Sequence, residues 1–383
     1  MNILFVESYI SPTNGGVQRV SWILKDFFEN NGHSCFFAYT LDDENELDPS
    51  KKLKINWNRR FWDIRGKLLD KKQFKDFVLF NDIDIIILQH LYMPNLFGLY
   101  KELKKKHGLK IIATTHTSPT LYYAKSKKST YMKIKDVYCR IIHGKLYQDN
   151  NMTNLYSIVD RWIMLSESYI MPFSKVFSFP DITKFAAIPN PLSFSYLLPI
   201  NDIDNKNNVV LIISRLDEAN KNLRSALRIW KNIENSGITN WTLRLGGHGD
   251  DEAMILSYAK QLGLQQFEFL GKVEDPQEEY KKAKLFMMTS KFEGFAMTLL
   301  ESLQNAVVPI VFDTFSAVHD IIDDGYNGHI IPDCNEDLFT NRLLSLMTEK
   351  DKLSKMQTNA LVSSKKFTID SIGQKWTDLL ESL

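Results

Sequence analysis

Residues 285–302 read LFMMTSKFEGFAMTLLES. The stretch begins with a short apolar run, which is typical of a strand buried on both faces of a sheet. A charged turn that contains a glycine follows, and a helical pattern begins near Ala296. Strand–turn–helix units of this kind build parallel sheets covered by helices, so the stretch predicts an α/β protein.

The same unit recurs along the 383-residue chain. A polar stretch with three prolines, 189–208, separates two α/β halves and predicts a linker. We expect two Rossmann-like doubly wound domains, 1–195 and 205–365, facing each other across a cleft, with a last amphipathic helix at 366–383 that crosses back to the first domain. The other expected strands are 2–6, 34–40, 84–88, 110–115, 161–165, 209–214, 242–247, 267–271 and 309–312.

The composition is that of a globular protein, with 44% hydrophobic and 24% charged residues. Three widely separated cysteines give no disulfide framework and no metal-ligand spacing. The first residues lack the basic segment of a signal peptide, and no apolar run approaches the length of a bilayer span. We therefore expect a cytoplasmic protein that does not cross a membrane.

The net charge of +1 conceals a strong polarity. Residues 51–150 contain 22 Lys and Arg against eight Asp and Glu, so they carry +14 while the rest of the chain carries −13. Basic clusters interleaved with aromatics, as in 122–135, suit an anionic membrane surface, and a peripheral position at the inner face of the cell membrane is favoured. A solvated basic face is the alternative. We expect no nucleic-acid partner.

Two carboxylates mark the turn and helix of the opening stretch. Glu293 and Glu301 lie on either side of a helix start, where the amides of Phe295, Ala296, Met297 and Thr298 are placed to bind phosphate. Gly294 allows the chain to turn and approach a ligand. Carboxylates accept hydrogen bonds from sugar hydroxyls, so a phosphorylated sugar fits both features. The alternative is an ordinary helix start with solvated glutamates.

Four further segments follow predicted strands. Arg215 and Lys221 suit a diphosphate, although two solvated surface cations are as plausible on spacing alone. LGGHG at 245–249 and NGG at 14–16 allow close approach of a ligand, but neither completes G-x-G-x-x-G, which disfavours NAD. His116 follows the strand at 110–115, and a buried structural histidine is its alternative.

Taken in order, NGGVQRV, TTH, the Arg215/Lys221 pair, LGGHG, FLGKV and EGFAMTLLE resemble the retaining GT-B glycosyltransferases of glycosyltransferase family 4. The resemblance implies that the second domain binds a nucleotide-sugar donor and the first an acceptor. It gives His116, Glu293, Arg215 and Lys221 catalytic roles, with Thr117 and Ser118 departing from the acidic residue that often follows the histidine. The residues that it assigns to donor binding are Gly16, Arg215, Lys221, Lys272, Val273, Glu293, Gly294, Phe295, Ala296, Met297, Thr298 and Glu301.

The family uses cations and helix amides to stabilise the leaving diphosphate. No D-x-D lies at a predicted strand end, so we expect neither a metal nor another cofactor. The resemblance implies transfer of a hexose or N-acetylhexosamine from a nucleotide sugar to a glycan or polyprenyl-linked acceptor in cell-surface polysaccharide synthesis. Within the family a UDP-sugar is the usual donor, and we expect one here. A nucleotide-sugar epimerase and a non-catalytic transferase subunit are the alternatives. Candidate acceptor-site residues are Trp57, Trp62, Tyr122, Tyr123 and Tyr131.

Overall fold

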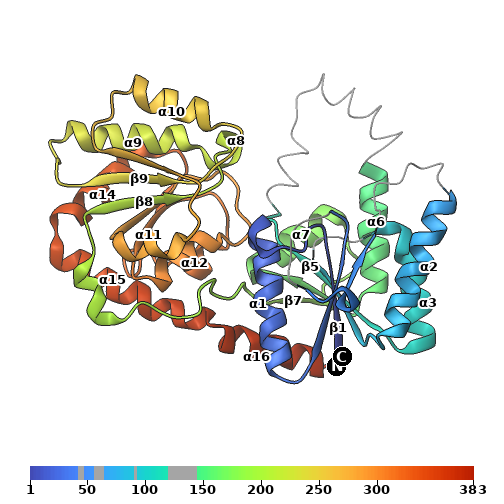
Figure 1. Ribbon diagram of the computed structural model, residues 1–383. Helices are drawn as coiled ribbons and strands as arrows, with labels where there is room; N and C mark the ends of the chain where they lie inside the picture. Colours follow the sequence, from blue (N-terminus) through green and yellow to red (C-terminus); the bar gives the residue numbers. More distant parts are fainter. Residues whose placement is uncertain (42–46, 56–63, 90–92, 120–144) are drawn as a thin grey trace, which may run out of the picture. The chain divides into compact units, whose positions relative to one another are not determined.

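A computed structural model describes residues 1–41, 47–55, 64–89, 93–119 and 145–383. The described chain forms two compact units (Figure 1). Unit 1 consists of Met1–Pro191 together with Ile369–Leu383, and unit 2 of Leu192–Thr368. In each unit, helices cover both faces of a parallel sheet.

Unit 1 has a seven-stranded sheet in the order β3-β2-β1-β4-β5-β6-β7. All of its paired strands are parallel, and the strand order reverses direction between β1 and β4. Ligands of doubly wound sheets bind at such a reversal, beyond the carboxyl ends of the strands. The elements of unit 1 are β1 (Asn2–Glu7), α1 (Gly16–Asn30), β2 (Ser34–Tyr39), β3 (Lys52–Lys54), α2 (Ile64–Phe80), β4 (Ile85–Gln89), α3 (Phe97–His107), β5 (Lys110–Thr115), α6 (Lys145–Ile158), β6 (Arg161–Met164), α7 (Ile170–Phe177), β7 (Phe185–Ala187) and α16 (Ile369–Glu381).

The C-terminal helix α16 packs against α1 at the other end of the sequence. Gly373 makes this possible, because a Cβ there would lie 2.4 Å from the ring of Phe27. Trp376 is buried beside Phe28, with ring centroids 6.5 Å apart. The predicted return of the last helix to the first domain is therefore confirmed, and it buries two large aromatic rings.

Unit 2 repeats the plan with the strand order β10-β9-β8-β11-β12-β13 and a reversal between β8 and β11. Its core lies between the sheet and helices α9, α14 and α15, and Trp230 is its largest fully buried side chain. The elements are β8 (Val209–Ile213), α8 (Glu218–Lys221), α9 (Leu223–Asn235), β9 (Thr242–Gly246), α10 (Glu252–Gln261), β10 (Phe267–Gly271), α11 (Pro276–Lys282), β11 (Leu285–Met288), α12 (Met297–Gln304), β12 (Val308–Asp313), α13 (Val318–Ile321), β13 (His329–Pro332), α14 (Glu336–Thr348) and α15 (Lys350–Ser364).

A buried lysine, Lys206, lies shortly before β8, the first strand of unit 2. Lys206 is only 5% exposed, and its Nζ donates to the carbonyl oxygens of Tyr280 (2.8 Å) and Lys281 (3.0 Å). These carbonyls end α11, where the helix dipole favours a cation. Desolvation by burial nevertheless lowers the pKa of Lys206 to about 7.

The Lys206 ammonium gives unit 2 a testable pH dependence. Its folded pKa is lowered below the unfolded value, so the unfolded chain binds more protons between about pH 7 and pH 10, and the free energy of unfolding rises with pH in that window. The slope is up to about 1.4 kcal/mol per pH unit. We expect Lys206→Met to flatten it in urea titrations at pH 7, 8 and 9. An unchanged slope in the variant would assign the pH dependence to other groups.

Candidate active site

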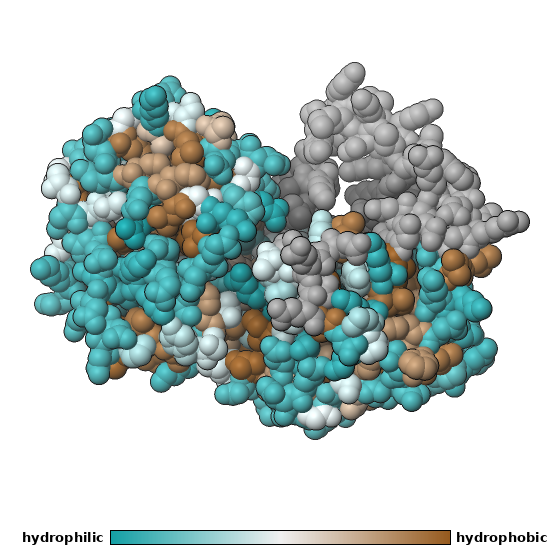
Figure 2. Space-filling view, viewed as in Figure 1, coloured by the Kyte–Doolittle hydropathy of each residue, from teal (hydrophilic) through white to brown (hydrophobic). Residues whose placement is uncertain are grey.

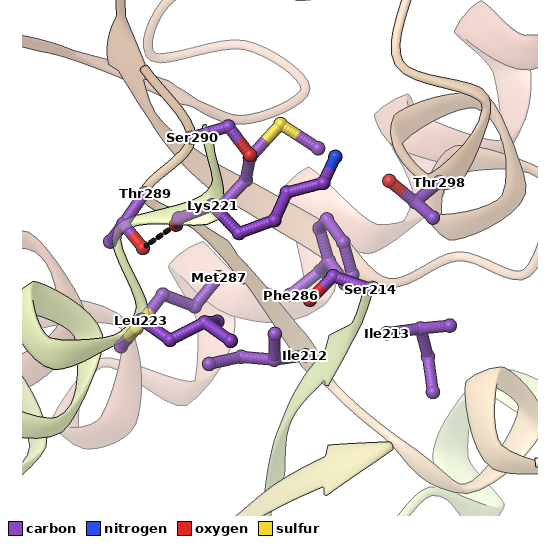
Figure 3. A pocket seen from close by; sticks show the side chains of 11 residues that line it. Ile212, Ile213, Ser214, Lys221, Leu223, Phe286, Met287, Thr289, Ser290 and Thr298 are labelled. Atoms are coloured by element: carbon purple, nitrogen blue, oxygen red, sulfur yellow. Dashed lines mark hydrogen bonds between the residues drawn. The ribbon is translucent and has the colours of Figure 1, made fainter. Parts of the chain in front are cut away.

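Of the site residues predicted from the second half of the sequence, Lys221 and Thr298 line a small cavity at the reversal point of the unit 2 sheet. Strands β8 and β11 lie side by side there, and the cavity opens beyond their carboxyl ends (Figure 3). Lys221 and Thr298 project into it from α8 and α12. The other lining residues are Ile212, Ile213, Ser214, Leu223, Phe286, Met287, Met288, Thr289 and Ser290.

The backbone beside Lys221 is fixed by the loop that follows β11. The Thr289 hydroxyl lies 3.1 Å from the carbonyl oxygens of both Lys221 and Asn222, within donating distance of each. The Lys291 amide donates to the carbonyl of Asn220 at 2.7 Å. Asn222 adopts a left-handed conformation (φ 50°) between α8 and α9, and these contacts hold it there. Sequence reasoning missed Thr289, whose only signal is its position directly after an apolar strand.

Lys221 and Glu293 form an ion pair. Lys221 Nζ lies 2.6 Å from Glu293 Oε1, and the two side chains are 23% and 12% exposed. The resemblance implies that Lys221 binds the diphosphate and that Glu293 binds the sugar. In the structure these two side chains lie beside each other. Each charge neutralises the other, which limits the cost of holding two charges in a partly desolvated site.

Arg215 and Ser214 continue the chain beyond β8. The Arg215 side chain is exposed, and within the described residues it makes no hydrogen bond or ion pair. The Ser214 hydroxyl is buried at the cavity and has no hydrogen-bond partner among the described residues. A serine hydroxyl and an exposed arginine are groups that accommodate phosphate oxygens.

The glycine-rich turn after β9 contacts a neighbouring loop. A Cβ on Gly247 would lie 1.8 Å from the carbonyl oxygen of Ser214, and one on Gly249 would lie 2.4 Å from that of Leu216. Backbone hydrogen bonds cross at the same place, from Ser214 N–H to Gly246 O (3.0 Å) and from Leu216 N–H to His248 O (2.9 Å). The glycines therefore permit the close packing that positions the Arg215 loop. The sequence analysis expected these glycines to allow close approach of a ligand and did not include this structural role.

The helix α12 begins at the cavity with a strained residue. Ala296 precedes it in a left-handed conformation (φ 39°, ψ 74°), and no side chain caps the first amides of the helix. Phe295 is 2% exposed and packs on Phe367, which anchors the turn. The uncapped amides of Met297 and Thr298 at the positive end of the helix suit an anion.

The strain at Ala296 predicts a stabilising substitution. Glycine adopts the left-handed region without the Cβ penalty, so Ala296→Gly should raise the free energy of unfolding by about 0.5–1 kcal/mol after the larger loss of backbone entropy. Ala253, an exposed residue in the first turn of α10, is the control, because Ala253→Gly relieves no strain and should be destabilising through the loss of backbone entropy. Thermal melts that shift in the same direction for both variants would contradict this assignment.

Glu301 lies one turn further along α12 and is 2% exposed. Its Oε1 accepts a hydrogen bond from the Ser193 hydroxyl at 2.7 Å. The role of Glu301 in donor binding stays a prediction. Lys272 and Val273 follow β10 at the edge of the sheet, where Lys272 is exposed and pairs with Glu274 at 3.0 Å.

Two predicted site residues belong to unit 1. Gly16 is the first residue of α1 and is exposed. His116 follows β5 at the carboxyl edge of the sheet, where its Nε2 lies 2.6 Å from the Gln89 side chain and 3.1 Å from Thr114 Oγ1. The candidate acceptor-site residues Trp57, Trp62, Tyr122, Tyr123 and Tyr131 lie outside the described residues.

The architecture and site can now be compared with known proteins. Residues 197–362 match the family model described as Glycosyl transferases group 1. Over this segment the chain is similar to that family. Anabaena Alr3699/HepE, solved in complex with UDP and glucose, superposes with a TM-score of 0.75 over 100% of both chains at 16% identity, so the fold is GT-B.

Two curated relatives are similar over just over half of this chain. The amylovoran biosynthesis glycosyltransferase AmsD of Erwinia amylovora is 26% identical over 230 residues, 59% of this chain and 63% of that protein. A Campylobacter jejuni enzyme is 28% identical over 207 residues, 54% of this chain and 57% of that protein. Its name is GalNAc-alpha-(1->4)-GalNAc-alpha-(1->3)-diNAcBac-PP-undecaprenol alpha-1,4-N-acetyl-D-galactosaminyltransferase. The chain thus spans about 60% of the length of these relatives.

Proposed function

We propose that the protein is a retaining glycosyltransferase that moves a hexose or N-acetylhexosamine from a nucleotide sugar to a glycan or lipid-linked acceptor. The observation that carries the proposal is the placement of Lys221 and the uncapped start of α12 on one cavity at the β8/β11 reversal. A cation and a helix N-terminus at that position suit a diphosphate. Glu293, beside the lysine, suits the hydroxyls of the attached sugar.

The chemistry of this arrangement follows from charge. Breaking the anomeric C–O bond leaves its electron pair on the diphosphate and positive charge on the sugar ring. Lys221, Arg215 and the α12 amides would stabilise the diphosphate electrostatically. The acceptor hydroxyl would attack from the same face, passing its proton to the leaving phosphate oxygen, and the anomeric configuration would be retained. Glu293 is not assigned as a nucleophile, because its carboxylate is paired with Lys221. In this scheme no metal is required.

The proposed substrates follow those of the similar proteins. The names of the relatives concern amylovoran and an undecaprenol-linked glycan, and the Anabaena structure holds UDP and glucose. By analogy we propose a UDP-sugar donor and an acceptor from cell-surface polysaccharide synthesis.

Donor and reaction type are tested in one series. Nucleotide sugars are first screened for thermal stabilisation, since a ligand at 100 times its dissociation constant adds about 2.7 kcal/mol. Stabilising donors are then incubated with the protein, and the products are analysed by NMR. Release of the nucleoside diphosphate with an α-configured sugar product supports retaining transfer. If the product is an epimerised nucleotide sugar, the protein is an epimerase and the proposal is wrong. The proposal is also contradicted if none of the nucleotide sugars stabilises the protein.

We also propose that unit 1 touches an anionic membrane through α2 and α3. Apolar side chains reach the surface over α2 (Figure 2), and Leu68, Leu69 and Phe80 are 61%, 51% and 86% exposed. Exposed lysines of α2 and α3, including Lys72 and Lys105, supply positive charge. Within the described residues, no helix is long and apolar enough to cross a bilayer.

A sedimentation experiment tests membrane contact. We expect the protein to pellet with vesicles that contain anionic lipid, and less so as salt is raised, because each basic residue near the surface adds about 1 kcal/mol. Phe80→Ser should weaken this binding. Val362→Ser, which also replaces an exposed apolar side chain but in unit 2, should not weaken it. Binding that is absent or insensitive to salt would end the proposal.

A further inference from the structure

The hydroxyl of Thr289 joins the end of β11 to the segment that carries Lys221. Thr289 directly follows β11 and is 3% exposed. Its Oγ1 lies 3.1 Å from the carbonyl oxygen of Lys221, a hydrogen bond that Figure 3 shows, and 3.1 Å from that of Asn222. A hydroxyl has a single proton, so the two oxygens share it. One buried side chain thus binds the main chain at the residue whose ammonium lines the site.

The main chain at Lys221 needs such a donor because the helix is interrupted there. Helix α8 ends at Lys221, and α9 begins at Leu223. Asn222 between them is left-handed (φ 50°), which breaks the run of helical hydrogen bonds. The last carbonyl oxygens of a helix have no intrahelical donor and take one from elsewhere. A methyl group in place of the Thr289 hydroxyl would remove the donor from both oxygens.

The segment that contains Thr289 is also held by its own neighbours. Thr314 follows β12, and its hydroxyl donates to the carbonyl oxygen of Ser290 at 2.7 Å. The Lys291 amide donates to the carbonyl oxygen of Asn220 at 2.7 Å. Because β8, β11 and β12 are adjacent strands, these bonds join the segments that follow three neighbouring strand ends. Thr289 therefore donates to the Lys221 segment from a position that is fixed on both sides.

We infer that Thr289 is a positioning residue, whose hydroxyl fixes the main chain at Lys221 so that the lysine ammonium stays beside Glu293. A lysine carries its charge on a flexible four-carbon stem, so the place of that charge depends on how firmly the Cα is held. The ammonium lies 2.6 Å from Glu293 Oε1. Under the proposed function, on which this consequence rests, the same constraint holds the ammonium where the diphosphate binds and lowers the entropy lost on binding.

Packing is the other role that a buried threonine can have, and two substitutions separate the roles. Thr289→Val keeps the shape of the side chain and removes the hydroxyl, whereas Thr289→Ser keeps the hydroxyl and removes the methyl group. If the hydroxyl positions Lys221, the valine variant is the more damaged at the site. If packing alone matters, the serine variant is the more damaged.

The inference is tested without a ligand through the coupling free energy between Lys221 and Glu293. Urea unfolding of the cycle formed by Lys221→Ala and Glu293→Gln gives this coupling in the wild type, in Thr289→Val and in Thr289→Ser. We expect Thr289→Val to reduce the coupling by about half or more and Thr289→Ser to retain it. The control is Thr340→Val, which removes a buried hydroxyl that donates to the Glu336 carbonyl oxygen in α14, and it should leave the coupling unchanged.

Two results overturn the inference: no coupling in the wild type, or equal coupling in the wild type and Thr289→Val. Should Thr289→Val fail to fold, Thr289→Ala takes its place. Alanine and serine differ only by the hydroxyl, so the coupling should then be weaker in Thr289→Ala than in Thr289→Ser, and equal coupling in these two variants overturns the inference.

Calorimetric titration with UDP tests the functional consequence. We expect Thr289→Val to weaken UDP binding by about fivefold or more and Thr289→Ser to stay within about twofold of the wild type. In a Lys221→Ala background, Thr289→Val should change the affinity by less than about twofold, because its effect passes through the lysine. An equal loss in both backgrounds would refute action through Lys221. A wild type that binds neither UDP nor any other nucleotide would refute the proposed function and leave the coupling result standing.

Discussion

Replacing Lys221 with alanine is expected to lower turnover by about 100-fold or more while the fold stays intact. A positioned cationic donor that stabilises developing charge is worth roughly 2.7–4 kcal/mol in the transition state. Lys221 is the described cation that lines the cavity, 2.6 Å from Glu293. The measurement is steady-state kcat and kcat/KM with the donor found by thermal screening, compared with Lys355→Ala, an exposed lysine of α15. Turnover within about threefold of wild type would contradict the role of Lys221.

Stability must be measured in the same variants, because Lys221→Ala leaves the Glu293 carboxylate without its ion-pair partner. The pair is partly exposed, so we expect a loss of about 1–2 kcal/mol in urea unfolding, less than for a fully buried pair. The double variant with Glu293→Gln should recover part of that stability but none of the turnover. Recovery of turnover would show that Lys221 matters only as a neutralising partner.

Replacing Gly247 with alanine is expected to destabilise unit 2 by about 4 kcal/mol or more. Its φ is 146°, and the added Cβ would lie 1.8 Å from the carbonyl oxygen of Ser214, so the loop that carries Arg215 must move. Since this oxygen belongs to the backbone, no side-chain rotation relieves the clash. We therefore also expect loss of nucleotide-sugar binding.

Gly263 is the matched control for Gly247. It also has a positive φ, 62°, but a Cβ there would have no atom within 4 Å. Gly263→Ala should cost only about 1–2 kcal/mol, the penalty of the left-handed conformation alone. Urea unfolding of both variants separates close packing from backbone conformation. If both variants lose the same free energy of unfolding, the close approach of the loops after β8 and β9 is not the reason for a glycine at position 247.

The central strands were predictable because strands buried on both faces are continuous apolar runs. The short strands β3, β7 and β13 were not predicted. β3 and β7 are three residues long, β13 is four and ends at Pro332, and all three lie at sheet edges, where burial imposes no apolar pattern. The strands with continuous apolar runs were thus predictable, including the edge strand β10, whereas the other three edge strands were missed.

The candidate site was predictable in its residues more than in its contacts. Lys221 and Glu293 were identified from turns after two strands, but their ion pair joins residues 72 positions apart and depends on β8 lying beside β11. Thr289 and Gln89 carry no sequence signal, since a threonine or a glutamine after a strand is common. The left-handed Ala296 also could not be predicted, because alanine gives no indication of a positive φ.

Calorimetric titration of the wild-type protein and Lys221→Ala with UDP and a panel of nucleotide sugars tests the central claim most directly. The claim is that Lys221 and the start of α12, at the β8/β11 reversal, bind the diphosphate of a nucleotide sugar. We expect at least one nucleotide sugar to bind the wild type, and to bind Lys221→Ala at least about tenfold more weakly, a difference of about 1.4 kcal/mol. Absence of binding to the wild type, or equal affinity in both proteins, would contradict the claim.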